Sequence, residues 1–369
     1  MRTSTLSQLN RTMVLASLMM GLAACDKSGG GVEIASTQQD FKVELTTQAR
    51  PIDILWVVDN SGSMASSQQN LASNFNSFIQ DFVALGYDFR MAVTTSDSWF
   101  EQYNSSPNAF YSSRWRTGNR ADLFNPSYAP QGAATNSGVF VMDKNTPALN
   151  SVFTTNVRVG TQGNGDERAF ASFQRALSNS ANNDFRRNNA YLAIIIVSDE
   201  DDFSRTDSTF SEDYNSPKLI PVDTFVSFLD TFTNSNSQNR KDNYQVSAIT
   251  ILDQACLNQL NNSSQKVAQR YLTMADITGG SKNSLCASFN AVLNNIKNSV
   301  LTAAAVFKLD REPVDGSIVV KVDGASIPTG ASTWTYESAT RTVRFAPQLA
   351  QSLNANSSIQ ITYDPKTLL

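Results

Sequence analysis

The sequence predicts an α/β fold, in which a doubly wound, mainly parallel sheet is followed by a small all-β module. Over residues 52–300, short and almost continuously apolar segments alternate with segments whose apolar residues recur at helical spacing. That alternation is typical of a parallel sheet covered by helices on both faces. After about residue 304, apolar and polar residues alternate one by one between Gly-containing turns. A period of two predicts β-strands in this last part of the chain.

The strands of the parallel sheet are expected at 52–58, 89–94, 191–197 and 244–252. A helix with one buried stripe is expected over 64–85, because apolar residues recur there every three or four positions. Further helices are expected around four apolar groups, at 170–177, 222–232, 267–272 and 289–300.

The sheet domain is expected to span 41–303, with a long insert at about 96–138, and the β module to span 304–369. The insert is rich in Asn, Ser and Arg, and it carries many aromatic side chains between Trp99 and Tyr128. An insert of this length is usually functional or disordered, and its aromatic residues argue against disorder. It is either a surface that selects a partner or a loop packed on its own aromatic side chains. Residues 41–45 also alternate and add a strand to one of the two domains.

Residues 1–24 are predicted to be a secretory signal peptide, because Arg2 and Arg11 precede a short apolar run. The run ends in Leu22-Ala23-Ala24-Cys25, which resembles the lipobox of bacterial lipoproteins. The resemblance implies lipidation of Cys25 and a lipid anchor to a membrane of the bacterial cell envelope. Residues 25–40 would then be a flexible, Gly-containing tether. The alternatives are an ordinary signal peptide with a chance Cys, and a short membrane anchor.

Charge and composition exclude several classes of function. The chain carries 29 Lys and Arg against 33 Asp and Glu, a net charge of −4, so it lacks the basic field that nucleic-acid binding needs. It contains no His, which excludes His-based triads, His-ligated zinc and His pH switches. Of its three Cys residues, Cys256 and Cys286 remain when Cys25 is set aside. An even pair in an exported protein predicts a disulfide, and the alternative is two buried thiols.

Oxygen-bearing side chains follow the first apolar strand directly. Asp59, Ser61 and Ser63 lie at alternate positions, where the strand ends and a helix begins. In open α/β sheets ligands bind at the carboxyl ends of strands, and hard divalent cations prefer oxygen ligands. These residues therefore predict a cation site, with Mg²⁺ as the first choice and Ca²⁺ or Mn²⁺ as alternatives. The other interpretation is a helix N-cap without any metal.

The spacing Asp-x-Ser-x-Ser at 59–63 resembles the metal-ion-dependent adhesion site of von Willebrand factor type A domains, and the likeness covers about 50–300. The resemblance implies a second carboxylate after a later buried strand, where Asp199 stands. Glu200 stands where the family usually has Gly, and more Asp residues follow, so the loop is more acidic than the family pattern. The family's Thr ligand corresponds to Thr161, although Glu167 is an alternative. The alternative interpretation of residues 199–202 is a solvated acidic turn without any metal.

The resemblance implies a binding module and not an enzyme. In that family the metal keeps an open position, which a carboxylate of a partner fills, so a protein or another envelope ligand is expected here. The alternatives are an envelope scaffold with a structural metal and a metal-dependent hydrolase. The sequence contains no nucleophile elbow and no phosphate loop, which argues against the hydrolase.

Overall fold

The structure is a computed structural model that describes residues 43–47, 49–84, 87–99, 137, 139–161, 163, 165–207, 213–260, 265–354 and 356–366. The predicted signal peptide at 1–24, Cys25, the tether at 25–40 and most of the insert at 96–138 lie outside the described residues. Within the described ranges, no helix combines the length and the apolar character that crossing a membrane requires.

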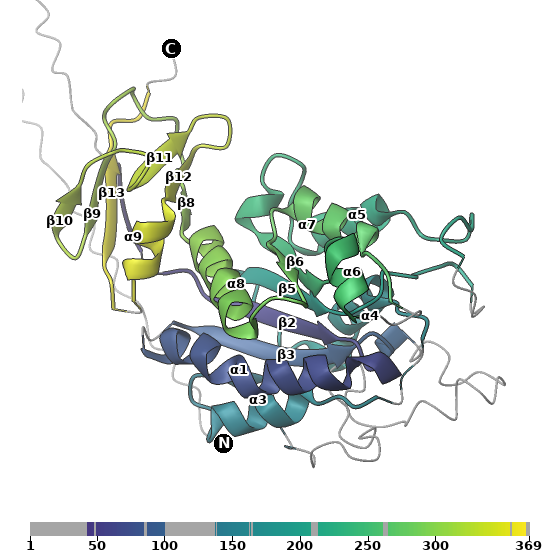
Figure 1. The fold of residues 1–369 in the computed structure, drawn as a ribbon. Coiled ribbons are helices and arrows are strands. Elements are labelled where there is room, and N and C mark those ends of the chain that lie inside the picture. Colours follow the sequence, from purple (N-terminus) through teal and green to yellow (C-terminus); the bar gives the residue numbers. More distant parts are fainter. Residues whose placement is uncertain are drawn as a thin grey trace, which may run out of the picture. The chain divides into compact units, whose positions relative to one another are not determined.

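A six-stranded sheet forms the centre of the sheet domain (Figure 1). Its strand order is β4 (Met142–Asp143), β3 (Phe89–Thr95), β2 (Ile52–Val58), β5 (Tyr191–Val197), β6 (Tyr244–Thr250) and β7 (Lys282–Ser284). Neighbouring strands are parallel, except that β4 runs antiparallel to β3. The predicted doubly wound, mainly parallel fold is therefore confirmed. Strands β2 and β5 are buried along their whole length, which explains their almost continuous apolar sequence.

Helices cover both faces of this sheet. Trp56 and Val58 of β2 pack on one face in a core shared with α1 (Ala65–Ala84), α3 (Leu149–Val157) and α8 (Phe289–Ala304). Leu55 and Val57 pack on the other face with α4 (Ala169–Ser178), α5 (Val222–Phe232) and α7 (Gln269–Thr278). Successive side chains of a strand point to opposite faces, so one strand supplies both cores.

The observed element boundaries differ from the predicted ones at a few places. The helix predicted over 64–85 begins with a 3-10 turn at Gly62–Met64, and α1 follows it. The strand predicted over 244–252 ends at Thr250. Helices α3 and α6 (Gln254–Leu260) and the short strands β4 and β7 were not predicted.

The predicted small β module is observed as two small antiparallel sheets with one short helix, α9 (Pro347–Ser352), and this helix was not predicted. One sheet has the order β1 (Val43–Thr47), β13 (Ile359–Tyr363), β9 (Val319–Val322) and β10 (Ala325–Ile327). The other has the order β11 (Trp334–Glu337), β12 (Thr342–Phe345) and β8 (Val306–Lys308). Val320, Trp334 and Tyr363 lie in their common core.

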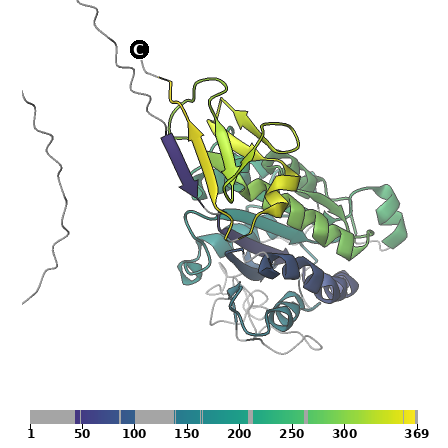
Figure 2. The ribbon, with the colours of Figure 1, turned by 90° about the vertical axis from the view of Figure 1, so that its left-hand side faces the viewer.

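The alternating residues near position 43 form β1, which belongs to the β module. It pairs antiparallel with β13, from Val43 opposite Tyr363 to Thr47 opposite Ile359 (Figure 2). The β module therefore takes one strand from before the sheet domain and the others from after it. In the chain, the sheet domain lies between β1 and β8, which belong to different sheets of the module.

Candidate functional site

The loop after β2 lies at the carboxyl edge of the sheet, between the ends of β3 and β5. The backbone N–H of Asp59 donates to the carbonyl of Val197, and that of Ser96 donates to the carbonyl of Val58. The Asp59 carboxylate is held at both oxygens. Its Oδ1 accepts the backbone N–H of Ser61 at 2.7 Å, and its Oδ2 accepts the Ser198 hydroxyl at 2.7 Å. Asp59 is 1% exposed, so a buried and fixed carboxylate directly follows β2 at the carboxyl edge of the sheet.

Ser61, Ser63 and Asp199 form one chain of hydrogen bonds across the same edge. The hydroxyl oxygens of Ser61 and Ser63 are 3.1 Å apart, and the Ser63 hydroxyl donates to Oδ1 of Asp199 at 3.0 Å. Ser61 precedes the 3-10 turn, but its side chain does not cap it. The structure therefore brings these three residues and Asp59 together from the ends of β2 and β5.

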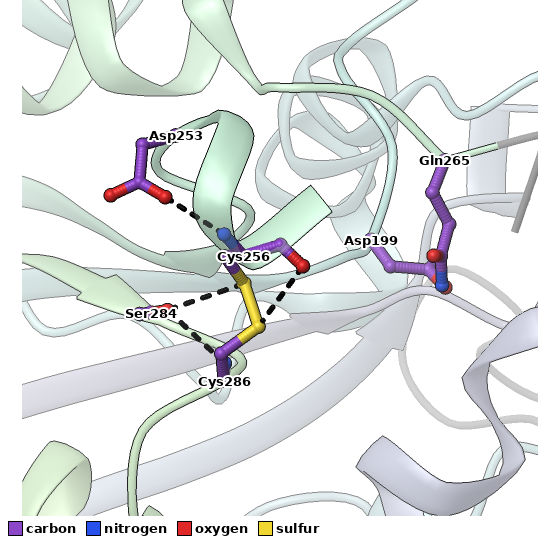
Figure 3. The surroundings of a disulfide bond; sticks show 6 residues. All are labelled: Asp199, Asp253, Cys256, Gln265, Ser284 and Cys286. Atoms are coloured by element: carbon purple, nitrogen blue, oxygen red, sulfur yellow. Dashed lines mark hydrogen bonds between the residues drawn. A yellow bond between two sulfur atoms is a disulfide. The ribbon is translucent and has the colours of Figure 1, made fainter. Parts of the chain in front are cut away.

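The second oxygen of Asp199 is held by a residue that the sequence did not single out. The Gln265 amide donates to Oδ2 of Asp199 at 2.6 Å, and Figure 3 shows the two side chains facing each other. The backbone N–H of Lys266 also donates to the Asp199 carbonyl. Asp199 is thus oriented by Ser63 on one side and Gln265 on the other, and it is 2% exposed.

The Thr161 segment lies against the Asp59 loop. The Gln68 amide donates to the carbonyls of both Asp59 and Gly160, and its oxygen accepts the Gly160 N–H. The backbone N–H of Gly163 donates to the Asn60 carbonyl at 2.7 Å. A Cβ atom on Gly163 would lie 2.5 Å from that carbonyl oxygen, so the close approach requires glycine. Half-buried Thr161 sits between these two contacts.

Glu167 lies just before α4, and it is 1% exposed. Neither of its carboxylate oxygens has a hydrogen-bond partner. Burial raises the pKa of Glu167 well above its usual value, and the charges of Asp59 and Asp97 raise it further. Ser96 is near enough to oppose this shift, but without hydrogen-bond geometry. Of the two residues that were proposed for the remaining ligand, Thr161 therefore belongs to a segment that contacts the Asp59 loop, and Glu167 lies within electrostatic range of Asp59.

The acidic run at 199–202 is not a solvated turn, because all four residues are at most 4% exposed. Asp201 accepts the backbone N–H groups of Arg270 and Tyr271 at the start of α7. Asp202 accepts the N–H of Phe170 at the start of α4 at 3.0 Å, and it pairs with the Arg270 guanidinium at 3.1 Å. Asp201 and Asp202 thus accept backbone N–H groups at the starts of α7 and α4, as helix-capping side chains do.

The electrostatics of this edge favour a cation. Burial and the neighbouring charge of Asp199 raise the pKa of Asp59 to about 7. Burial also raises the pKa of Asp199, while Gln265 and Ser63 oppose that rise. Two carboxylates, several hydroxyls and backbone oxygens make an all-oxygen set, which fits Mg²⁺, Ca²⁺ or Mn²⁺. Among the described residues, no three Asp, Glu or Cys side chains are grouped so that they alone would hold a metal ion.

The predicted disulfide between Cys256 and Cys286 is confirmed, so the alternative of two buried thiols is wrong. The Cα atoms are 5.7 Å apart. The bridge joins α6 to the segment between β7 and α8, and the Asp253 carboxylate accepts the backbone N–H of Cys256 at 2.9 Å (Figure 3). Helix α6 begins just after β6, at the same edge of the sheet as the candidate site.

Neither a protein-family model nor a curated protein matches the sequence. Among solved structures, the chain is similar to the pilus adhesin SpaC from Lactobacillus rhamnosus GG in its open conformation, with 13% identity and a TM-score of 0.40 over 88% of this chain and 41% of the adhesin. A second structure of SpaC has 12% identity and a TM-score of 0.37, over 88% of this chain and 42% of that chain.

A third similar structure is proximal thread matrix protein 1 from the mussel byssus. It has 11% identity and a TM-score of 0.36, over 73% of this chain and 52% of the matrix protein. The chain therefore spans about half of the length of these proteins or less.

Proposed function

We propose that this chain is a binding protein of the bacterial cell envelope, anchored by lipid at Cys25, with a sheet domain of the von Willebrand factor type A class. The domain holds a divalent cation, Mg²⁺ as the first choice, at Asp59, Ser61, Ser63 and Asp199. Through the cation it binds a protein or another envelope ligand that offers a carboxylate. The lipid anchor rests on the lipobox resemblance, and the disulfide agrees with an exported protein.

The observation that carries this proposal is the hydrogen-bonded chain across the carboxyl edge. Ser61 and Ser63 connect the Asp59 loop to Asp199, so residues from the ends of two neighbouring strands meet through two hydroxyls. An ordinary helix cap needs one side-chain oxygen that faces backbone N–H groups. Here the two Ser hydroxyls face each other and the Asp199 carboxylate, which supports a ligand set over a helix cap.

A bound cation would also offset the repulsion between two buried carboxylates. Asp59 and Asp199 are buried side by side, and the charge of Asp199 disfavours the ionised form of Asp59. Without a counter-charge, such a pair has to take up protons or lose stability. A bound divalent cation would offset both charges and offer its open coordination position to a ligand oxygen. Mg²⁺ usually keeps several waters, so one of them can give way to a partner's carboxylate.

Thr161 is the better candidate for the remaining ligand, with Glu167 as the alternative. The Gln68 bridge and the close contact of Gly163 with Asn60 hold the Thr161 segment against the Asp59 loop. A neutral hydroxyl adds no further repulsion to the two carboxylates. Glu167, by contrast, would bring a third buried negative charge to one ion.

The direct test is a calorimetric titration of the full-length, metal-free chain with Mg²⁺. Asp59→Ala removes a charged oxygen that no neighbour replaces, so we expect binding to weaken by about 100-fold or more. Asp276→Ala is the matched control, because Asp276 is 62% exposed and pairs with Lys282, which is itself exposed. Identical isotherms for the wild type and Asp59→Ala would return these residues to a structural role.

Partner binding is tested by capture from envelope extract on the immobilised full-length chain, with Mg²⁺ or with chelator. We expect the wild type to retain a partner only with Mg²⁺, and Asp59→Ala to retain none. A scaffold with a structural metal gives a different result. In that case chelator lowers the unfolding temperature, but the same partner is captured with and without the metal.

A further inference from the structure

The two carboxylates of the candidate cation site are held at all of their oxygens. Both oxygens of Asp59 accept a hydrogen bond from a neighbour in the chain or across the sheet. Oδ1 of Asp199 accepts the Ser63 hydroxyl at 3.0 Å, and Oδ2 accepts the Gln265 amide at 2.6 Å. A carboxylate binds a cation through both oxygens only when both are turned toward it. Carboxylates held in this way are suited to binding an ion through one oxygen each.

Gln265 holds Asp199 from outside the proposed ligand set. Ser63 is itself a proposed ligand, because a hydroxyl can face an ion with a lone pair while it donates its proton to Asp199. Gln265 instead engages Oδ2, the oxygen that Ser63 leaves open, and Figure 3 shows its amide turned toward Asp199. The next residue, Lys266, donates its backbone N–H to the Asp199 carbonyl at 3.3 Å. Two hydrogen bonds therefore fix the Gln265 segment against Asp199.

The oxygen of the same Gln265 amide is buried, and among the described residues it has no hydrogen-bond partner. A buried acceptor without a partner costs free energy, so its position calls for an explanation. It belongs to the amide group that contacts Asp199, and it therefore lies beside the candidate cation site. Water molecules bound to a cation carry O–H groups that need acceptors. A free acceptor at this place suits a cation that keeps part of its water.

These two properties of Gln265 distinguish between Mg²⁺ and Ca²⁺. Mg²⁺ requires near-octahedral geometry and usually keeps several waters, whereas Ca²⁺ takes roughly six to eight oxygens and often binds a carboxylate through both of its oxygens. An Asp199 that is limited to one oxygen, next to an acceptor for bound water, favours Mg²⁺. Release of Oδ2 would give Ca²⁺ the additional oxygen that its larger coordination shell accommodates.

We propose that Gln265 determines the choice of cation and selects Mg²⁺ over Ca²⁺. Its N–H group keeps Asp199 to a single oxygen, and its carbonyl oxygen accepts a hydrogen bond from a water on the ion. Gln265 is thus a specificity-determining residue that does not contact the cation itself. This inference rests on the proposed function and deepens it, because the spacing of residues 59–63 alone does not distinguish Mg²⁺ from Ca²⁺.

The test is calorimetric titration of the full-length, metal-free chain with Mg²⁺ and, separately, with Ca²⁺. The wild type should bind Mg²⁺ more tightly. Gln265→Met keeps the length of the side chain but has neither the N–H group nor the carbonyl, so the ratio of the Ca²⁺ Kd to the Mg²⁺ Kd should fall by about 10-fold or more. Gln265→Glu replaces the donor with another carboxylate oxygen, so Ca²⁺ should bind more tightly than to the wild type. Gln254→Met is the matched control, because exposed Gln254 donates only within α6, to Asn258.

The outcomes separate the role of Gln265 from the cation site as such. An equal loss of affinity for both cations in Gln265→Met would overturn the selectivity and leave the proposed function intact, because Gln265 would then only hold Asp199 in place. A wild type that binds Ca²⁺ as tightly as Mg²⁺ would overturn it as well. A wild type that binds neither cation would reject the proposed function, and the selectivity with it. Cooperative urea unfolding, followed by circular dichroism, shows which variants are folded, and Gln265→Glu carries the test if Gln265→Met is not.

Discussion

At the scale of single residues, the candidate site depends on residues that are not among its proposed ligands. Gln68 connects the Asp59 loop to the Gly160 segment, and Gln265 orients Asp199. Each of these amides fixes an oxygen that belongs to a different part of the chain. A site assembled from three segments needs such connections, because a ligand displaced by a fraction of an ångström binds a small ion less well.

Gly163 makes the closest of these connections, and it gives a sharp prediction. In Gly163→Ala the new methyl group would lie 2.5 Å from the Asn60 carbonyl oxygen, so one of the two loops has to move. We expect the free energy of unfolding to fall by about 1–3 kcal/mol, with weaker Mg²⁺ binding. Gly165→Ala is the matched control, because nothing lies within 4 Å of its added carbon. Urea unfolding and calorimetry of both variants check this, and equal behaviour of the two would contradict it.

At the scale of elements, the sequence predicts long helices and strands with a regular apolar pattern, and it misses short elements that depend on tertiary contacts. Strands β2 and β5 coincide with the predicted 52–58 and 191–197, because burial on both faces demands an apolar run. Strands β4 and β7 have only 2 and 3 residues, too few to show a period. Helix α6, with 7 residues, buries a single side chain, Cys256, and so has no apolar stripe.

The same distinction applies to the candidate site. Asp59 and Asp199 could be related from the sequence, because each follows a buried strand and parallel strands end at one edge. Asp97 follows β3 in the same way, but its polar neighbours made it look like part of the insert. The burial of Glu167 and the helix caps made by Asp201 and Asp202 depend on how α4 and α7 pack, which no local pattern shows.

The disulfide holds α6, a helix of 7 residues that is too short to be stable alone. Cys256 lies in α6, and four residues separate the end of that helix from Gln265, the partner of Asp199. Cys256→Ser/Cys286→Ser opens a loop with a sequence separation of 30 residues. The free energy of unfolding should fall by about 3–4 kcal/mol in the chain-entropy account. We also expect weaker Mg²⁺ binding, because Gln265 would hold Asp199 less firmly.

Urea unfolding and calorimetric titration measure these two effects of the disulfide. The control is the reducing agent itself, which should change the wild type toward the double variant and leave the double variant as it is. Unchanged Mg²⁺ affinity in a less stable variant would mean that α6 stabilises the fold without positioning Asp199.

At the scale of the whole molecule, a net charge of −4 conceals a concentration of buried acids at one edge of the sheet, and this predicts how stability depends on pH. Burial raises the pKa of Asp59 to about 7 and that of Asp201 to about 7. In the unfolded chain these groups return to an ordinary pKa of about 3.9. Between these values the folded state binds more protons than the unfolded state, so the free energy of unfolding of the metal-free protein should fall as pH rises from about 4 to about 7.

Mg²⁺ should reverse much of this loss of stability near neutral pH, because it binds the ionised folded form. Asp59→Asn cannot ionise at this position, so its metal-free stability should depend less on pH. Urea unfolding at pH 5 and pH 7.5, in chelator and in Mg²⁺, tests all three statements. If the metal-free wild type became more stable toward pH 7.5, the buried acids at this edge would have to be ionised and compensated within the protein alone, and the electrostatic argument for a cation would fail.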